Sequence, residues 1–229
     1  MRMTQAQLDH YHEQGWVVVK NVVDKATIDK IRQELADVHE RFAAEPPKHP
    51  RVGIAWEPKM PEGAPKRVWQ LMGSEIVSPT LNDVITGDDM LDLVEQIIGP
   101  DITLYHSKLL MTAPHVGASY SPWPQDYGYW HPMETEPTQV NCALAIYPQT
   151  KANGCLHYVP GSHKQGLLQH TRSNNGGFDW GLGNDINQFP GVPVEYDAGD
   201  VCFFGSLVIH GSEANRTDEP ATFNTTAYD

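Results

Sequence analysis

Residues 198–220 read AGDVCFFGSLVIHGSEANRTDEP and contain a strand signal on which the fold prediction depends. A Gly-Asp turn precedes an apolar run at 200–210, rich in β-branched and aromatic residues, which is typical of a strand. The run ends at His210, directly before a glycine. Similar runs between Gly, Pro and Asn turns predict further strands at 102–112, 138–147, 155–160, 192–197 and 222–228.

The N-terminal third has a helical pattern instead. Thr4 can cap a helix that Gly15 ends, and apolar residues from Asp24 to Glu45 recur at helical spacing until Pro46 closes the pattern. The sequence therefore predicts helices at 5–14, 24–45 and 88–98, a strand at 16–19 and a loop in the Pro-rich segment 46–66.

Strands that follow a helical third indicate an α+β fold that is mainly β. We expect a double-sheet β-roll, or jelly roll, buttressed by the N-terminal helices. Because β-rich chains of 229 residues commonly remain undivided, we predict one domain over residues 1–229. The Gly- and Asn-rich segment 171–191 is long for a loop in a compact domain, so we predict that it is a lid over a site.

The charge of the chain restricts its partners. A net charge of -13 argues against nucleic acid and anionic membranes, which select clusters of Lys and Arg. No apolar stretch approaches the length of a membrane span, and the first residues lack a signal-peptide core. We expect a soluble, cytoplasmic protein whose partner is a small molecule or another protein.

Two local features are interpreted as having no special role. The cysteines lie in apolar runs without the spacing of a zinc site, so buried free thiols are expected at Cys142, Cys155 and Cys202. Glycosylation sequons begin at Asn215 and Asn224, and without a signal peptide we interpret both as chance.

Four stretches together resemble one known family. They are YHSKLLM at 105–111, WPQDYGYW at 123–130, NGCLHYVPGSHKQG at 153–166, and residues 198–220. The chain resembles the phytanoyl-CoA dioxygenase (PhyH-like) family of Fe(II)- and 2-oxoglutarate-dependent oxygenases, and the resemblance spans nearly its whole length. It implies a double-stranded β-helix, a cupin-like jelly roll, whose mouth holds Fe(II) on a His-x-Asp pair and a distal His. Three ligands on one face leave room for the oxo-acid and O2.

The positions that match this metal site are only partly filled. By resemblance, Asp126 and His210 are the carboxylate and the distal histidine ligands, but the first ligand position is Pro124, which has no donor atom. The family also grips 2-oxoglutarate with an arginine eleven residues after the distal histidine, and that position is Ala221. Fe(II) and 2-oxoglutarate are thus implied cofactors, whose binding by this chain is in question.

Other residues can be assigned by the same resemblance. Lys108 and Ser212 are expected near the oxo-acid, and Lys108 could replace the lost arginine as a point charge. His106, His115 and His131 are candidates for a substitute metal ligand, or are ordinary polar or pocket residues. We interpret His157 and His163 as structural. The predicted substrate wall consists of Trp123, Tyr127, Tyr129, Trp130 and His131.

These residues leave three functions open. The first is a catalytically impaired or non-catalytic subunit that supports an active oxygenase, in a heterodimer with a related chain or in a homodimer. The second is an active non-haem iron oxygenase with a rearranged metal site that oxidises a small molecule. The third is a small-molecule-binding protein on a scaffold that has lost catalysis. The substrate cannot be deduced from the fold.

Overall fold

The structure, a computed structural model, describes residues 1–58, 60–115, 123–131, 136–172, 180–182 and 189–229. The α-helices are α1 (Gln5–Gln14), α2 (Lys25–Leu35), α3 (Val38–Ala44), α4 (Ser74–Val77), α5 (Pro79–Ile85), α6 (Asp88–Ile98) and α7 (Tyr127–Trp130). A 3-10 helix spans Ser162–Gln165. The strands are β1 (Trp16–Val19), β2 (Gly53–Trp56), β3 (Val68–Met72), β4 (Leu104–Thr112), β5 (Val140–Ala145), β6 (Leu156–Tyr158), β7 (Thr171–Arg172), β8 (Trp180–Gly181), β9 (Val192–Pro193), β10 (Val201–Gly205), β11 (His210–Ser212) and β12 (Ala221–Tyr228).

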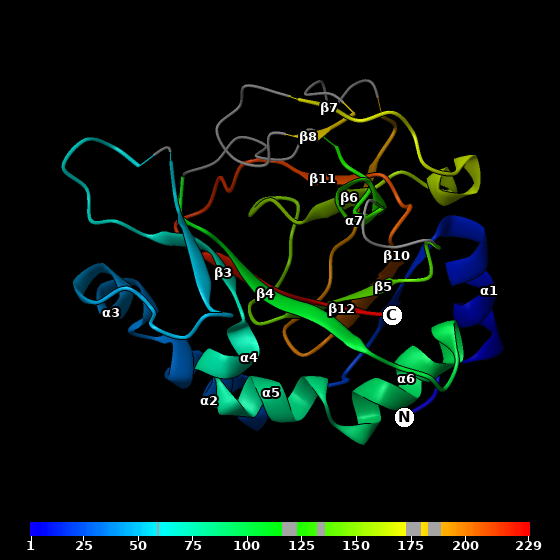
Figure 1. Cartoon of the computed structure of the whole chain (residues 1–229), viewed down its shortest axis with the longest axis horizontal. Helices are drawn as coiled ribbons and strands as arrows, with labels where there is room; N and C mark the ends of the chain where they lie inside the picture. The colour runs from blue at the N-terminus through cyan, green and yellow to red at the C-terminus, as the bar shows by residue number, and fades with distance from the viewer. Residues whose placement is uncertain (59, 116–122, 132–135, 173–179, 183–188) are drawn as a thin grey trace.

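Two facing sheets form the core of the fold. In the described residues the larger sheet has the strand order β1-β10-β5-β12-β4-β3-β2, and the smaller one has the order β11-β6-β9. The large sheet has α2, α4, α5 and α6 on one side and the small sheet on the other, with the β7–β8 ribbon beyond the small sheet (Figure 1). The α+β, mainly β jelly roll expected from the sequence is confirmed.

Alternation along β4 separates the two faces of the large sheet. Ser107, Leu109 and Met111 are buried on the helix-covered face. The alternate residues, such as Lys108 and Leu110, face the small sheet, because successive strand side chains point to opposite faces. Register extends this inner face across the sheet, since each residue shares a face with its strand partner. The relevant pairs are Gln70↔Leu110, Thr225↔Lys108, Phe223↔Leu110 and Ala227↔Asn141.

The predicted helix at 24–45 is two helices. Asp24 caps α2 by accepting from the Thr27 amide at 2.9 Å, but α2 ends at Leu35 and α3 begins at Val38. The predicted loop at 46–66 also differs, because residues 53–56 form β2 at the edge of the large sheet. Edge pairing to β3 supplies backbone hydrogen bonds that local propensity does not reveal.

The predicted strand at 200–210 is likewise two strands in different sheets. β10 pairs with β5 in the large sheet, and the chain then turns at Gly205, whose carbonyl accepts from the Val208 amide at 3.0 Å. β11 begins at His210 and pairs with β6 in the small sheet. This change of sheet carries His210 across the mouth of the jelly roll.

The two local interpretations fit the structure. The three cysteines are buried and unpaired, as predicted. The amide of Asn224 is fully buried and donates to Ser74 Oγ at 2.7 Å, while Asn215 is 1% exposed. Neither amide is accessible to a glycosylating enzyme in the folded chain. None of the helices within the described ranges is both long and apolar enough to cross a bilayer.

Candidate functional site in the mouth of the jelly roll

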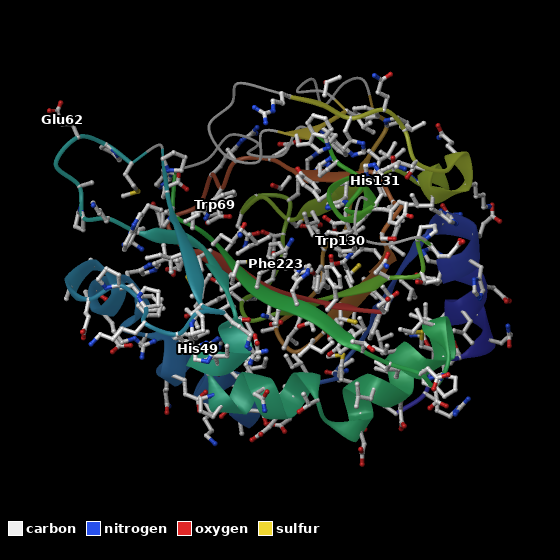
Figure 2. The ribbon with its side chains drawn as sticks, viewed as in Figure 1. His49, Glu62, Trp69, Trp130, His131 and Phe223 are labelled. Carbon is white, nitrogen blue, oxygen red and sulfur yellow. The ribbon has the colours of Figure 1, made fainter. Side chains whose placement is uncertain are left out.

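A cavity of about 520 Å³ lies between the two sheets. Its apolar and aromatic wall includes Trp69, Tyr105, Leu110, Trp130, Phe204 and Phe223. Its polar residues include His106, Lys108, Asp126, His210, Ser212 and Thr225. Trp69, Trp130 and Phe223 lie near the middle of the molecule in Figure 2, Trp69 from β3 and Phe223 from β12 on the large sheet and Trp130 from α7. Of the residues predicted to hold cofactor or metal, Lys108, Asp126, His210 and Ser212 are thus brought together.

Asp126 and His210 meet at the polar end of this cavity. Asp126 Oδ2 lies 3.8 Å from His210 Nε2 and accepts a hydrogen bond from Asn141 Nδ2 at 3.0 Å. His210 Nδ1 lies 2.9 Å from the Val208 carbonyl oxygen. Because a carbonyl only accepts, Nδ1 carries a proton, and the Nε2 edge of the ring faces the carboxylate. Both residues are therefore oriented as two members of a metal-binding set would be.

Pro124 lies beside these two residues. Its carbonyl oxygen accepts from the His210 amide at 3.1 Å, and the residue lines the cavity together with Asp126. The position thus faces the site that the family resemblance assigns to a ligand, but the pyrrolidine ring has no lone pair to offer. Ala221 pairs with Thr112 and is 4% exposed, on the same face of β12 as Phe223. A methyl group there cannot bind a carboxylate.

The candidate substitute ligands do not complete the set. His131 is exposed, and its Nδ1 lies 3.3 Å from the Gly128 carbonyl oxygen. His115 is exposed and pairs with Asp218 at 2.7 Å. His106 lines the same cavity, yet no group of three His, Cys, Asp or Glu side chains in the described part of the chain is arranged to hold a metal ion. The donor set present does not fit Fe(II) in the manner of the family.

His106 is nevertheless an unusual group. Its Nε2 atom is buried without a hydrogen-bond partner, and the ring contacts Trp130 edge-on at 5.4 Å. Burial is the largest cause that lowers the pKa of His106, to about 4 in all; the positive charge of Lys108 acts in the same direction and Asp126 opposes both. The imidazole is therefore neutral at pH 7 and can offer one donor and one acceptor to a bound molecule.

This low pKa predicts a contribution to acid sensitivity. Unfolded histidine protonates near pH 6.5, whereas folded His106 does so near pH 4, so stability falls as the pH drops through this interval. Between pH 7 and pH 4 the wild type should lose unfolding free energy on the order of 3 kcal/mol or less through His106, and His106→Gln should remove this loss. Urea unfolding at several pH values measures it, with exposed His49→Gln as the control. Equal pH slopes for the wild type and His106→Gln would contradict the assignment.

The predicted substrate wall is divided by the structure. Tyr129 and Trp130 line the cavity. Tyr127 is buried but is not among the lining residues, and exposed His131 lies outside the cavity as well. Residues 127–130 form the short helix α7, so neighbouring side chains point in different directions around its axis.

Trp123 lies on the other side of the small sheet. It is 1% exposed and packs with Val159 and Ile209. A Cβ at Gly211 would lie 2.9 Å from the indole ring, which shows how closely the tryptophan covers this face. Trp123 has φ 51°, a left-handed conformation that a bulky residue adopts only when packing compensates for the strain. Its position supports the site from behind, away from the cavity.

Three supporting residues were not recognised in the sequence. Asn141 orients the Asp126 carboxylate. Gln125 is fully buried, and its side-chain amide nitrogen donates to the Gly166 and Leu207 carbonyls, each at 2.8 Å. The Gln125 backbone amide donates to His170 Nε2 at 3.0 Å. The sequence did contain a signal for Gln125: it lies between the two ligand positions, 124 and 126. Because these two face the cavity, the side chain between them is expected to point away from it.

The predicted lid is described only in part. Within 171–191, residues 173–179 and 183–188 lie outside the described residues, and β7 and β8 form a two-stranded ribbon. The Tyr129 hydroxyl donates to the Trp180 carbonyl, which links this ribbon to a cavity-lining side chain. Lid function stays a prediction.

His157 and His163 occupy the positions expected of packing residues. His157 contacts Trp123 edge-on on the outer face of the small sheet, and burial lowers its pKa. His163 Nε2 lies 3.1 Å from the His12 carbonyl oxygen and joins the 3-10 helix to α1. Neither residue is among those that line the cavity.

The two-sheet core with a His and an Asp at its mouth defines a jelly-roll scaffold of the kind used by non-haem iron oxygenases. Residues 11–223 match the family model for phytanoyl-CoA dioxygenase (PhyH). A probable phytanoyl-CoA dioxygenase of Caenorhabditis elegans is 29% identical over 223 residues, covering 91% of this chain and 69% of that protein. The chain belongs to the phytanoyl-CoA dioxygenase family.

Other relatives agree with this assignment. The peroxisomal phytanoyl-CoA dioxygenase of Mus musculus is 29% identical over 94% of this chain and 65% of its own length, so the chain spans about two thirds of these relatives. The crystal structure of EctD from S. alaskensis with 2-oxoglutarate and 5-hydroxyectoine superposes with a TM-score of 0.77 at 17% identity, over 99% of this chain and 76% of that one. That structural likeness concerns the fold.

Proposed function

We propose that this chain is a catalytically impaired family member that binds a small organic molecule in the cavity between its two sheets. One observation carries the proposal: Pro124 occupies the first metal-ligand position, while the cavity beside it is open and about 520 Å³ in volume. Such a volume is typical of small-molecule sites. The chain thus has a cavity in which a small molecule could bind, but it lacks one of the metal ligands that the family's oxygen chemistry requires.

The lining suggests how a molecule would be held. Trp69, Trp130 and Phe223 offer an apolar surface for the body of the ligand. At the polar end, Asp126 and His210 accept hydrogen bonds, and Lys108 and Ser212 donate them. A few polar groups in an otherwise apolar cavity fix the orientation of a ligand rather than most of its affinity.

Support of an active oxygenase, as a heterodimer subunit or a homodimer, is the second candidate. The observation in its favour is an intact family fold that carries substitutions at two cofactor positions, Pro124 and Ala221. An obligate interface is extensive and apolar, however. In the described residues the exposed large hydrophobic side chains are Met1, Leu167 and Val192, which are too few for an extensive apolar interface, so we rank binding first.

An active oxygenase with a rearranged metal site is the third candidate function. It would need a third donor beside Asp126 and His210, and the described histidines do not supply one in place. Iron analysis of the purified chain and an assay for succinate formed from 2-oxoglutarate separate this candidate from the others. Stoichiometric iron with succinate would favour it over binding.

The binding proposal is tested by blocking the cavity. Thr225 is 2% exposed and faces the cavity from β12, so Thr225→Phe should fill it, and exposed Thr86→Phe is the matched control. A panel of small aromatic and alicyclic alcohols, amines and acids is screened by thermal unfolding. A ligand present at 100 times its Kd should add about 2.7 kcal/mol of stability to the wild type and to Thr86→Phe.

Thr225→Phe should lose this response. Quenching of tryptophan fluorescence gives a second readout, because Trp69 and Trp130 line the cavity. Binding that persists in Thr225→Phe, or a panel without any stabilising member, would reject the proposal. Co-expression with a related oxygenase, followed by size-exclusion chromatography, tests the subunit role independently.

A further inference from the structure

A second cavity of about 210 Å³ lies elsewhere, where the ends of α2, β4 and β5 meet α3 and the start of β3. Its lining includes Arg32, His39 and Arg67, and none of the described residues that line it is Asp or Glu. In a chain with a net charge of -13, such a concentration of basic groups is unexpected.

Arg32 is held in position on one wall. Its Nε and Nη2 atoms donate to the Ile146 carbonyl at 2.9 and 2.7 Å, and Nη1 donates to Asp29 at 3.0 Å. The guanidinium also lies over the Tyr147 ring, 4.5 Å from its centroid. These contacts use three of the five guanidinium hydrogens and leave two. The fixed orientation lowers the entropy lost when a ligand is bound.

His39 and Arg67 form the other part of the basic lining. His39 Nδ1 accepts from the Val68 amide at 3.0 Å, so a neutral ring carries its proton on Nε2 and can donate from there. Burial lowers the pKa of His39, and the positive charge of nearby Arg67 lowers it further. Among the described residues, the ion pairs formed by arginines involve Arg32, Arg41, Arg51 and Arg216 and do not include Arg67.

We propose that this second cavity binds a small oxyanion, a carboxylate or phosphate group, between Arg67, His39 and Arg32. Guanidinium groups match the planar geometry of such oxyanions and form charge-assisted hydrogen bonds with them. The apolar lining provided by Leu35, Val38 and Met111 would hold the remainder of a small organic acid. The anion would offset the positive charge of Arg67, for which the described residues provide no ion pair.

This site is separate from the cavity of the proposed function and does not depend on it. The two cavities adjoin at Thr112, which lines both. Thr112 is also the strand partner of Ala221, the position where the family places the arginine for 2-oxoglutarate. The basic groups of the second cavity come from α2, α3 and the residue before β3, so the substitution at Ala221 leaves them in place.

The test is titration calorimetry with inorganic phosphate and with benzoate at constant ionic strength. The two anions distinguish a phosphate site from a site for an organic carboxylate. Arg67→Gln should weaken binding about tenfold to hundredfold, the loss expected for charge-assisted hydrogen bonds. Arg67→Lys, which keeps the charge but not the fork, should weaken it less. Exposed Arg2→Gln, far away in sequence, should bind like the wild type.

Circular dichroism confirms that each variant is folded before titration, and Arg67→Lys keeps the test valid if Arg67→Gln does not fold. The proposal is supported if the wild type binds either anion, Arg67→Lys binds it more weakly, and Arg67→Gln binds it most weakly. Absence of binding by both anions overturns it. Equal affinity of the wild type and the Arg67 variants also overturns it, because the anion would then be bound elsewhere.

Discussion

The double substitution Pro124→His and Ala221→Arg is expected to bind Fe(II) stoichiometrically, whereas we expect the wild type not to do so. We expect affinity for Fe(II) to rise by at least about 100-fold, since loss of an outer-shell partner alone typically costs 10- to 100-fold. Binding of 2-oxoglutarate should appear only when both substitutions are present, because its carboxylates need both a metal ion and an arginine.

The surrounding structure is suited to this reversal. The Pro124 carbonyl accepts from the His210 amide at 3.1 Å, so a new imidazole at position 124 would begin close to His210 and Asp126. Replacing proline costs no hydrogen bond, since proline has no backbone donor to lose. Pro124 borders an existing cavity, which gives the larger side chain space. Asn141 already orients the Asp126 carboxylate at 3.0 Å.

Anaerobic Fe(II) titration, followed by iron analysis after desalting, measures the effect. Pro124→Ala controls for removal of the ring without addition of a donor, and Ala221→Arg alone controls for the added charge. Neither should bind Fe(II) more tightly than the wild type. If the wild type binds one equivalent of Fe(II) as tightly as the double variant, another donor completes the site and the proposed loss of function is wrong.

The sequence predicted burial better than it predicted backbone structure. Ile28, Ile31, Leu35, Val38 and Phe42 are all buried as their spacing required, although the helix breaks between Leu35 and Val38. The spacing of apolar residues indicates which face of a helix is buried, and here the same face stays buried on both sides of the short break. Neither Ala36 nor Asp37 is a helix breaker, so no local signal marked the interruption.

The position of a site residue could be predicted where a family motif fixes it, and not where the direction of a side chain depends on local geometry. Asp126, His210, Lys108 and Ser212 line one cavity, and their roles toward a metal ion and an oxo-acid stay predictions. Trp123 was grouped with Tyr129 in the predicted substrate wall, but it has a positive φ and its indole packs behind the small sheet. A single φ reversal changes the face that a side chain occupies, and the sequence gives no period from which to infer it.

Replacing Gln125 by alanine is expected to cause the largest loss of stability among the substitutions considered. Gln125 lies between Pro124 and Asp126 and is fully buried. Its Nε2 donates to the Gly166 and Leu207 carbonyls at 2.8 Å each, and its Oε1 accepts from the Leu168 amide at 2.8 Å. The side chain thus joins the segment before the predicted lid to the turn between β10 and β11.

Gln125→Ala leaves these three partly buried backbone groups without their side-chain partner, so we expect a loss of about 2–4 kcal/mol of unfolding free energy. Urea denaturation measures it, and exposed Gln169→Ala should change stability by less than about 0.5 kcal/mol. Gln125→Glu separates the interactions, because a carboxylate still accepts from Leu168 but cannot donate to the two carbonyls. It should also be strongly destabilising, since an acceptor would face two acceptors. A Gln125→Ala loss as small as that of Gln169→Ala would show that water replaces the amide and that the site does not depend on this link.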